Sequence, residues 1–398
     1  MKLTFIHDHI FVKDSIGNYY STGKLPYRSW QRYIEHNHNL TVIGRVEKRI
    51  NVDGLERSSG ENVDFFCVPS ISSPKDLVKN RQSVKKLMTG KIKDSDALII
   101  RLPSVLGNLA VSIAEKENIP YSLEVVGDAW NAYWNYGNIV GKALAPIAYI
   151  QAKKKIFNAK YAMYVTENYL QNKYPTKGLQ AFCSNVELSK VDEVNLENRL
   201  IKIDSEKDKK KLIIGQISSL NPSYKGIDTA IIALSKIKEA IPDFEYRILG
   251  DGDKGKWARL AKEYNLEKNI FFDGTLPRQE VNLWLDQLDI YIQPSKTEGL
   301  PRAIIEAFSR ACPTIASNAG GIIELVEESC RFKAGSSNEL AALIEKKCQN
   351  KEWLIEQSKR NFLISKKYQK DILEEKRFEF LKNFFDNIES NKTESENY

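Results

Sequence analysis

The regular alternation of short apolar runs with longer segments of helical period most constrains the fold of this chain. In the first half, runs rich in β-branched and aromatic residues alternate with segments whose apolar residues recur every three or four positions. Parallel strands need a long crossover connection, usually a helix, so the alternation predicts parallel sheets with helices on both faces. The expected strands are Lys2–Ile6, Leu40–Val46, Val63–Val68, Ala97–Leu102, Tyr121–Val126 and Ala162–Thr166, and the expected helices Tyr27–His36, Lys75–Met88, Val105–Asn118 and Ile139–Phe157.

A charged segment separates this alternation from a second round of it. Residues 189–211 end in KIDSEKDKKK, and we interpret them as the connection between two domains, residues 1–200 and 201–366. Two doubly wound domains facing a cleft are therefore expected, with ligands at the carboxyl ends of the strands. The second set of strands is Leu212–Ile217, Glu245–Leu249, Ile270–Phe272, Ile290–Gln293 and Thr314–Ala316, and the helices are Ile227–Ala240, Lys254–Tyr264, Arg278–Leu285 and Pro301–Ala311.

The C-terminal part differs from both domains. Lys367–Ile388 has the period of one long helix with an apolar face, which must pack on another part of the chain. Residues 389–398 are polar and are expected to be disordered.

Composition excludes several classes of protein. The 398 residues are 42% hydrophobic and 28% charged, as in soluble globular proteins, and the net charge of +7 fits an anionic partner. The sequence has no signature of a nucleic-acid-binding domain, signal peptide or membrane span. Five cysteines without CxxC spacing indicate reduced thiols, so a cytoplasmic location is expected.

The stretch SKTEGLPRAIIEAF carries two glutamates, Glu298 and Glu306, around an expected helix start. Pro301 suits the first helical position, so the free amides near Gly299 and Leu300, with the helix dipole, would bind an anion. The two carboxylates would then accept bonds from sugar and ribose hydroxyls on either side of a phosphate. A dipole-stabilising acid beside a solvated glutamate, or the acid pair of a glycosidase, fits the same spacing.

The longer stretch DIYIQPSKTEGLPRAIIEAFSRACPTIASNAGGIIELV resembles the donor-site signature of retaining GT-B glycosyltransferases of family 4. Pro294-Ser295, both glutamates, Pro313 and Gly320-Gly321 carry that resemblance. It implies two Rossmann-like domains facing a cleft and a C-terminal helix, 367–388, that crosses back to the N-terminal domain. The segments GQISSLNPSYKGIDTAIIAL, SLEVVGDAWNAYWNYGN and YAMYVTENYLQNKYP resemble a capsular and exopolysaccharide subfamily of these enzymes.

The resemblance assigns roles on the donor side. Glu298 would hold the donor sugar, Glu306 the ribose, and Lys225 with the Gly299 and Leu300 amides the diphosphate; Ser219 is a further donor-binding candidate. Where many members have an arginine, this chain has Gln216. Arg278 and Arg302 are therefore candidates for a second phosphate-binding cation.

On the acceptor side, Asp128 could orient a hydroxyl and Trp130 could stack on a sugar ring. A helix N-cap for Asp128 and ordinary packing for the aromatic cluster of Trp130, Tyr133, Trp134 and Tyr136 fit equally well. Two further cleft candidates are a loop with Gly17 and Gly23, which could also be a plain turn, and Arg101 at the end of a strand. Separately, Lys153–Lys155 and Lys160 form a basic run on a helix that could rest on anionic lipid or be solvated.

The resemblance therefore implies a metal-independent glycosyltransferase without a cofactor, in which Lys225 and the helix N-terminus take the role of a metal; Asp251-Gly252-Asp253 is interpreted as a turn. The donor would be a nucleoside-diphosphate sugar and the acceptor a glycan or lipid-linked glycan of a bacterial surface polysaccharide. The enzyme would lie in the cytoplasm, in peripheral contact with the membrane. A non-catalytic sugar-nucleotide-binding partner and a GT-B epimerase are the alternatives.

Overall fold

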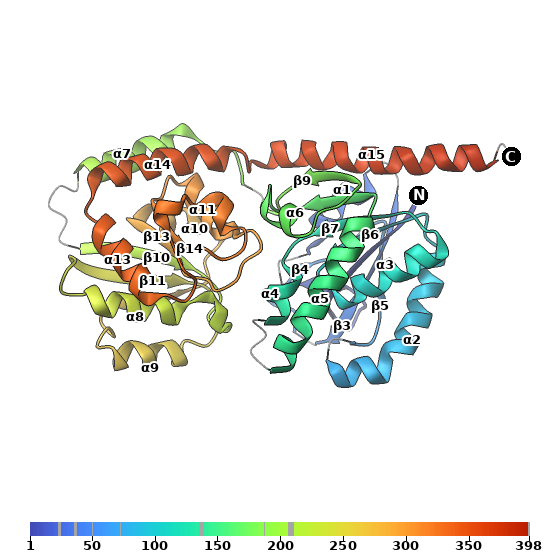
Figure 1. The fold of residues 1–398 in the computed structure, drawn as a ribbon, viewed down its shortest axis with the longest axis horizontal. Helices are drawn as coiled ribbons and strands as arrows, with labels where there is room; N and C mark the ends of the chain where they lie inside the picture. Colours follow the sequence, from blue (N-terminus) through green and yellow to red (C-terminus); the bar gives the residue numbers. More distant parts are fainter. Residues whose placement is uncertain are drawn as a thin grey trace. The chain divides into compact units, whose positions relative to one another are not determined.

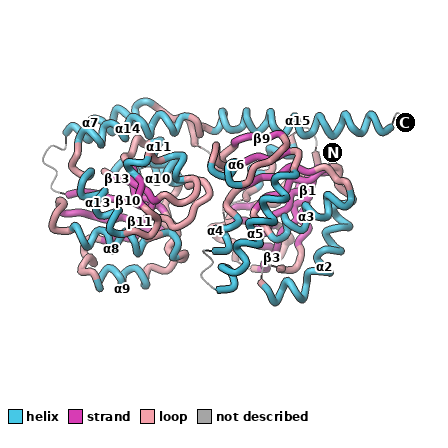
Figure 2. Tube along the Cα trace, viewed as in Figure 1, coloured by secondary structure: helices cyan, strands magenta, loops and turns pink. Residues whose placement is uncertain are grey.

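The computed structural model describes residues 1–22, 25–35, 38–49, 51–71, 73–134, 139–186, 188–205 and 211–396. The chain divides into two compact units (Figure 1). Unit 1 comprises 1–165, 170–183 and 376–398, and unit 2 comprises 166–169 and 184–375. Each unit is an α/β structure built on one twisted sheet (Figure 2).

Unit 1 contains a largely parallel sheet with the strand order β5-β3-β1-β6-β7-β8-β9. A short antiparallel ribbon, β2 and β4, continues from the far end of β1. The expected strands are all present, and β1 is longer than predicted. The strands are β1 (Lys2–Lys13), β2 (Tyr19–Ser21), β3 (Asn39–Lys48), β4 (Glu56–Arg57), β5 (Val63–Cys67), β6 (Ala97–Leu102), β7 (Tyr121–Val125), β8 (Tyr161–Tyr164) and β9 (Leu179–Phe182).

The helices of unit 1 follow the expected crossovers. The segment expected as one helix from Tyr27 divides into a 3-10 turn and the short helix α1. Ser73 and Ser104 cap the crossover helices α2 and α3 through their side-chain oxygens. The helices are η1 (Tyr27–Ser29), α1 (Gln31–Ile34), α2 (Pro74–Lys93), α3 (Val105–Glu117), α4 (Ala129–Trp134), α5 (Ile139–Asn158) and α6 (Tyr169–Lys173).

Unit 2 contains a six-stranded sheet in which every neighbouring pair is parallel. Its order, β12-β11-β10-β13-β14-β15, is the 3-2-1-4-5-6 order of dinucleotide-binding folds. The order reverses between β10 and β13, where crossovers leave on opposite faces and ligands bind. The strands are β10 (Lys211–Ile217), β11 (Asp243–Leu249), β12 (Ile270–Gly274), β13 (Ile290–Gln293), β14 (Thr314–Ser317) and β15 (Arg331–Phe332).

The helices of unit 2 form two groups, with α8 packed on α13 and α14 packed on both α7 and α11. The expected helices are present, whereas α7, α12, α13 and α14 were not predicted. The elements are α7 (Glu193–Ser205), η2 (Ser223–Lys225), α8 (Ile227–Ile237), α9 (Gly255–Glu263), α10 (Arg278–Gln287), α11 (Arg302–Ser309), α12 (Ile322–Leu325), η3 (Glu328–Cys330), α13 (Ser337–Lys347) and α14 (Lys351–Lys366).

The boundaries differ from the predicted ones in two places. The charged segment at 189–211 contains α7, which belongs to unit 2, so the change of unit comes after Cys183 and not at 200. The C-terminal helix, α15 (Lys370–Glu396), enters unit 1 at Lys376. It continues as helix to Glu396, over residues that were expected to be disordered; 397 and 398 lie outside the described residues.

Two further findings concern the cysteines and the helices. Burial raises the pKa of all five cysteine thiols, which favours their protonated form. Within the described part of the chain, none of the helices combines the length and apolar character that crossing a bilayer requires.

Candidate active site

The switch point of the unit 2 sheet brings the two predicted donor-site loops together. Lys225 lies in the turn after β10, and Glu298 lies in the loop after β13. The Lys225 Nζ atom is 2.7 Å from Glu298 Oε1, and both side chains are mostly buried. The residues are 73 positions apart in sequence, so the parallel sheet creates this pair.

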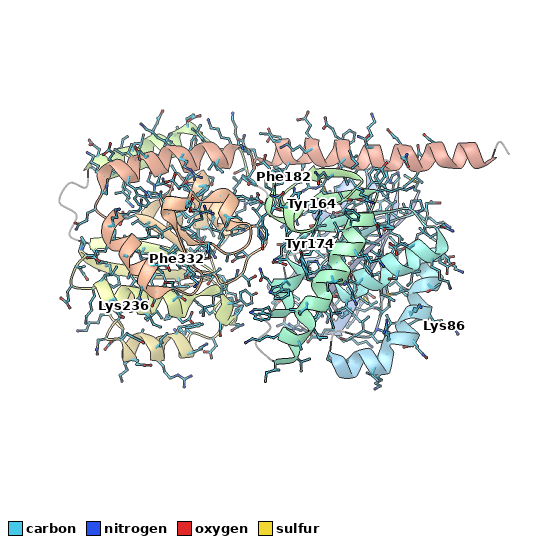
Figure 3. All side chains as sticks on the ribbon, in the orientation of Figure 1. Lys86, Tyr164, Tyr174, Phe182, Lys236 and Phe332 are labelled. Atoms are coloured by element: carbon cyan, nitrogen blue, oxygen red, sulfur yellow. The ribbon has the colours of Figure 1, made fainter. Side chains whose placement is uncertain are left out.

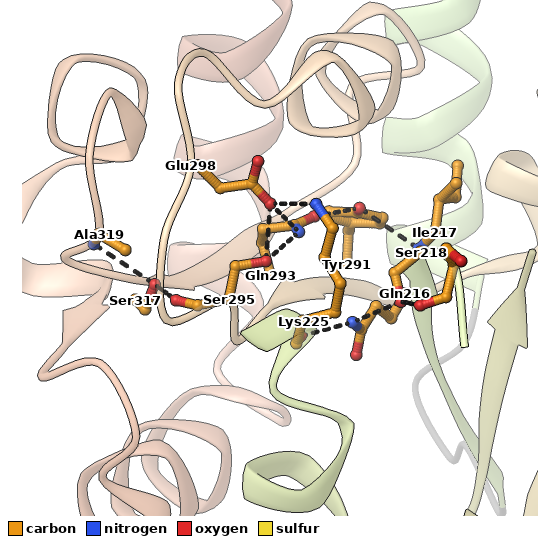
Figure 4. Close-up of polar contacts among 11 residues, drawn as sticks. Gln216, Ile217, Ser218, Lys225, Tyr291, Gln293, Ser295, Glu298, Ser317 and Ala319 are labelled. Atoms are coloured by element: carbon orange, nitrogen blue, oxygen red, sulfur yellow. Dashed lines mark hydrogen bonds and ion pairs between the residues drawn. The ribbon is translucent and has the colours of Figure 1, made fainter. Parts of the chain in front are cut away.

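Glu298 is held by a network of side chains from β13 and the following loop (Figure 4). Ser295 Oγ donates to Glu298 Oε1 at 2.7 Å, and Gln293 Nε2 donates to the same oxygen at 3.2 Å. Tyr291 donates to Gln293 Oε1 at 2.6 Å and accepts a bond from the Ile217 amide at 3.3 Å. The carboxylate is therefore fixed in position before any ligand binds.

Gln216, which stands where a cation was expected, supports the loop that carries Lys225. Its side chain is fully buried and donates to the Lys225 carbonyl at 3.0 Å and to Ser218 Oγ at 3.1 Å. Tyr246 donates to the Gln216 side-chain oxygen. The residue therefore positions Lys225 and carries no charge toward a phosphate.

Close backbone approaches lock the site loops together. Gly226 has a φ of +74°, and a Cβ there would lie 1.9 Å from the Pro294 carbonyl oxygen. A Cβ on Gly320 would come equally close to the Glu298 carbonyl oxygen, and the Gly321 amide donates to the Gly299 carbonyl at 2.8 Å. The Gly-Gly turn noted in the sequence thus forms the support beneath the Glu298 loop.

We expect Gly226→Ala to destabilise the protein by about 3 kcal/mol or more, because it adds a steric clash to left-handed backbone strain. Gly274, with a φ of +70° and open space around its Cα, is the matched control. Gly274→Ala should carry the strain alone, about 1–2 kcal/mol. Thermal unfolding of both variants measures the difference, and equal losses would contradict the tight packing against Pro294.

Glu306 lies on α11 at the edge of a pocket of about 140 Å³ within unit 2. Arg278, at the start of α10, and Ile217, at the end of β10, line the same pocket. Burial raises the pKa of the Glu306 carboxyl, and the Arg302 and Arg278 guanidinium groups partly offset this increase. The lining is mixed: besides Glu306 and Arg278 it includes the charged Lys190 and Arg310, and its apolar members are Leu188, Val191, Ile217 and Val281.

The raised pKa of Glu306 predicts a pH-dependent stability change. The pKa of Glu306 is higher in the folded state than in the unfolded state, so folding opposes ionisation of this carboxyl. The resulting loss of folding free energy is absent below the unfolded pKa and grows as the pH rises toward the folded pKa. Glu306→Gln should therefore raise the Tm of the ligand-free protein at pH 7 by about 2 °C. The gain should vanish near pH 4, where the carboxyl is mostly protonated in both states. A gain that is larger at pH 4 than at pH 7 would contradict the assignment.

One of the remaining donor-side predictions, the helical position of Pro301, needs a correction, and the others receive local contacts. Helix α11 begins at Arg302, so Pro301 is its N-cap residue and not the first helical residue. Ser219 Oγ donates to the Asp251 carbonyl at 3.2 Å, at the edge of the switch point. Asp251 and Asp253 each accept a bond from a nearby backbone amide, which fits the predicted turn.

The unit 1 candidate Asp128 is buried and fully engaged. Its Oδ1 accepts bonds from Tyr174 at 2.5 Å and from the Trp130 amide at 3.0 Å, and its Oδ2 pairs with Lys173 at 2.6 Å. The Tyr164 hydroxyl donates a hydrogen bond to the Tyr174 carbonyl at 2.7 Å. Both tyrosines are labelled in Figure 3. This arrangement favours the helix-start interpretation, because both carboxylate oxygens already have partners.

The other unit 1 candidates are also held by local contacts. Trp130 stacks on Trp134, with ring centroids 5.3 Å apart. Arg101 lies near the end of β6, as expected, where it is largely buried and pairs with Glu124 at 2.6 Å. Gly17 lies in an exposed turn closed by Asp14. Gly23 and Tyr136 lie outside the described residues.

Sequence reasoning noted Ser295 as part of the donor-site motif but missed four other residues that hold the site: Tyr291, Gln293, Ser317 and Tyr246. Gln293 and Tyr291 lie on a fully buried strand, where each polar group needs a partner. That requirement was a usable signal. Ser317 was harder to predict, because its hydroxyl, at the end of β14, donates to the Ser295 carbonyl in the loop after the neighbouring strand β13.

The chain is similar to a known protein family, to two named relatives and to a solved structure. A family model described as glycosyl transferases group 1 matches residues 197–370. Protein CapJ of Staphylococcus aureus is 40% identical over 323 residues, which cover 81% of this chain and 80% of CapJ. The putative colanic acid biosynthesis glycosyltransferase WcaL of Escherichia coli K12 is 38% identical over 109 residues, 26% of this chain and 27% of WcaL. The structure of Anabaena HepE in complex with UDP and glucose aligns with a TM-score of 0.63 at 16% identity, covering 96% of this chain and 99% of HepE.

Proposed function

The chain belongs to the glycosyl transferases group 1 family and has the GT-B fold; from this premise we propose that it transfers a sugar from a nucleoside-diphosphate sugar to a glycan acceptor with retention at the anomeric carbon. The observation that carries the proposal is the Lys225–Glu298 pair at the switch point of the unit 2 sheet. A cation and a carboxylate side by side suit a ligand with a diphosphate joined to a polyhydroxylated ring.

The residues of unit 2 provide one group for each part of such a donor. Lys225 would bind the diphosphate, together with the amides of Gly299 and Leu300 before α11. Glu298 would accept bonds from sugar hydroxyls, and Glu306 from the ribose hydroxyls. Arg278 lies beside Glu306 in the same pocket, where it can contact the nucleoside or its phosphates.

In the proposed reaction Lys225 takes the role that a metal ion would otherwise have, because its ammonium group would lie next to the phosphate on which negative charge develops. The bond between the anomeric carbon and the phosphate oxygen breaks as the acceptor oxygen attacks from the same face. The acceptor proton passes to the leaving phosphate oxygen. Lys225 stabilises the charge that develops on that phosphate, which is a stronger interaction in the transition state than in the ground state.

The proposed process is the synthesis of a bacterial surface polysaccharide. The relative WcaL is named for colanic acid biosynthesis, and AmsK of Erwinia amylovora, 35% identical over 109 residues, is named for amylovoran biosynthesis. Those names support an exopolysaccharide or capsular glycan as acceptor, free or linked to a lipid.

A panel of UDP-, GDP- and ADP-sugars tests the donor. UDP-sugars come first because the structurally similar HepE binds UDP and glucose. We expect one nucleotide class to raise the Tm and to release its nucleoside diphosphate slowly in the absence of acceptor. Stabilisation without turnover, even with glycan acceptors, would instead favour a sugar-nucleotide-binding partner.

A further inference from the structure

A second ion pair joins the two loops that carry Lys225 and Glu298. Lys296 Nζ donates to Asp228 Oδ2 at 2.7 Å, and the two side chains are 34% and 33% exposed. Asp228 follows Lys225 in the chain, in the first turn of α8, and Lys296 precedes Glu298 in the loop after β13. Each loop therefore carries a cation followed by an anion, and each of these charges has a partner on the other loop.

The backbones of the two loops are in contact beside these ion pairs. The Lys296 amide donates to the Tyr224 carbonyl at 2.7 Å, and a Cβ on Gly226 would lie 1.9 Å from the Pro294 carbonyl oxygen. The later residue of the first loop thus meets the earlier residue of the second, so the loops run in opposite directions.

The order of the charges matches this direction. Because the loops run in opposite directions, Lys225 meets Glu298 and Asp228 meets Lys296. Loops that ran in the same direction would bring the two lysines together and the two carboxylates together, and like charges repel at such distances. The charges therefore specify how the loops lie against each other, and with it the position of the Lys225 ammonium group.

Asp228 is also linked to the residues that support Lys225 from inside the unit. Burial and the charge of Asp228 raise the pKa of the Tyr246 hydroxyl, which therefore stays protonated and donates to the Gln216 side-chain oxygen. Gln216 Nε2 in turn donates to the Lys225 carbonyl at 3.0 Å (Figure 4). Asp228 Oδ1 is buried and accepts no hydrogen bond from the described residues, so the carboxylate depends on its other oxygen, which Lys296 binds.

A simpler interpretation treats Asp228 and Lys296 as an ordinary surface pair. The helix dipole alone stabilises an acid in the first turn of a helix, and a partly exposed ion pair contributes little to stability. That interpretation does not require the cation to come from the Glu298 loop, and it leaves the reversed order of the charges without a cause. It predicts that loss of the pair leaves sugar transfer unchanged.

We propose that Lys296 and Asp228 are positioning residues for sugar transfer, whose ion pair holds the two loops so that Lys225 and Glu298 lie side by side. This inference rests on the proposed function, and neither residue would touch the donor. Misplacement of a binding group by about 1 Å can cost as much as about a hundredfold in rate. Since Lys225 would act mainly on the charge of the transition state, its displacement should lower kcat more than it raises KM.

Kinetics of single and double variants test the positioning role. Lys296→Met and Asp228→Asn should each lower kcat by about tenfold, with a smaller change in KM. The double variant should be no slower than the slower single variant, because the second substitution removes an interaction that is already lost. Lys296→Arg keeps the charge and should stay within about threefold of the wild type. A lower Tm with an unchanged kcat would instead show a merely structural role.

Hydrogen–deuterium exchange of the ligand-free protein tests the contact between the loops without any donor. The amide of residue 296 is bonded to the Tyr224 carbonyl, so its exchange reports opening of this contact. We expect residues 294–301 to exchange at least about threefold faster in Lys296→Met and Asp228→Asn than in the wild type. Lys296→Arg should exchange as the wild type does.

Lys211→Met is the matched control for both measurements. Lys211 Nζ lies 2.8 Å from Glu245 Oε1, in an ion pair of the same unit. This pair joins the beginning of β10 to β11, at the opposite end of the strands from the switch-point loops. Its loss should leave kcat and the exchange of residues 294–301 at their wild-type values.

Two results would overturn the proposal. One is a kcat within about threefold of the wild type for both Lys296→Met and Asp228→Asn. The other is exchange of residues 294–301 that neither substitution changes. A wild type that transfers no sugar from any donor would refute the proposed function instead, and exchange would then decide by itself whether the ion pair holds the loops.

Discussion

Glu298→Ala is expected to lower kcat/KM for sugar transfer by about a thousandfold. The substitution removes the carboxylate that would bind the donor sugar and leaves Lys225 without its partner at 2.7 Å. It also leaves the Ser295 and Gln293 donors without their shared acceptor. Initial rates with a saturating acceptor, at several donor concentrations, measure the effect.

The control for Glu298→Ala is Glu239→Ala, which removes an exposed carboxylate from the same unit. Glu239 has a side-chain exposure of 90% and lies 3.9 Å from Lys238. The Glu239→Ala enzyme should transfer sugar at the wild-type rate. A Glu298→Ala enzyme that keeps its fold by thermal unfolding and works within about threefold of wild type would refute the assigned role.

Lys225→Met is expected to lower kcat by about a hundredfold to a thousandfold, through the loss of charge stabilisation at the leaving phosphate. Because that charge develops in the transition state, the loss should fall more on kcat than on KM. Donors with better leaving groups should suffer less. The lysine backbone stays in place, because Gln216 holds its carbonyl.

Lys238→Met is the matched control, since it removes one positive charge from the other member of the exposed pair. A loss confined to KM would show that Lys225 binds the ground state and the transition state equally. That result would preserve the donor site and remove the proposed catalytic role.

Much of the fold could be predicted because its determinants are local. Strands such as Ala97–Leu102 and Ile290–Gln293 were placed with their observed bounds, since buried parallel strands form short apolar runs. Helix α7 was missed because its charged residues resemble a linker. Its Arg199 is nevertheless buried and donates to the Leu285 carbonyl at 2.9 Å, a contact made only in the folded unit.

The candidate site shows the same division. The resemblance already implied that Lys225 and Glu298 share one donor site, and the pairing of β10 with β13 explains their proximity. The role of Gln216, which stands where many related enzymes have an arginine, could not be predicted. Its partners, the Tyr246 hydroxyl and the Lys225 carbonyl, come from other segments of the chain. Asp128 had two open interpretations, and only the positions of Tyr174 and Lys173 distinguish them.

The contact between the loops at 222–226 and 294–301 has a consequence for engineering. The Gly226 Cα faces the Pro294 carbonyl, and the Lys296 amide donates to the Tyr224 carbonyl at 2.7 Å. Neither loop can change its backbone path without displacing the other. A graft of one loop from a relative, intended to alter donor choice, should therefore be exchanged together with its counterpart as a single cassette.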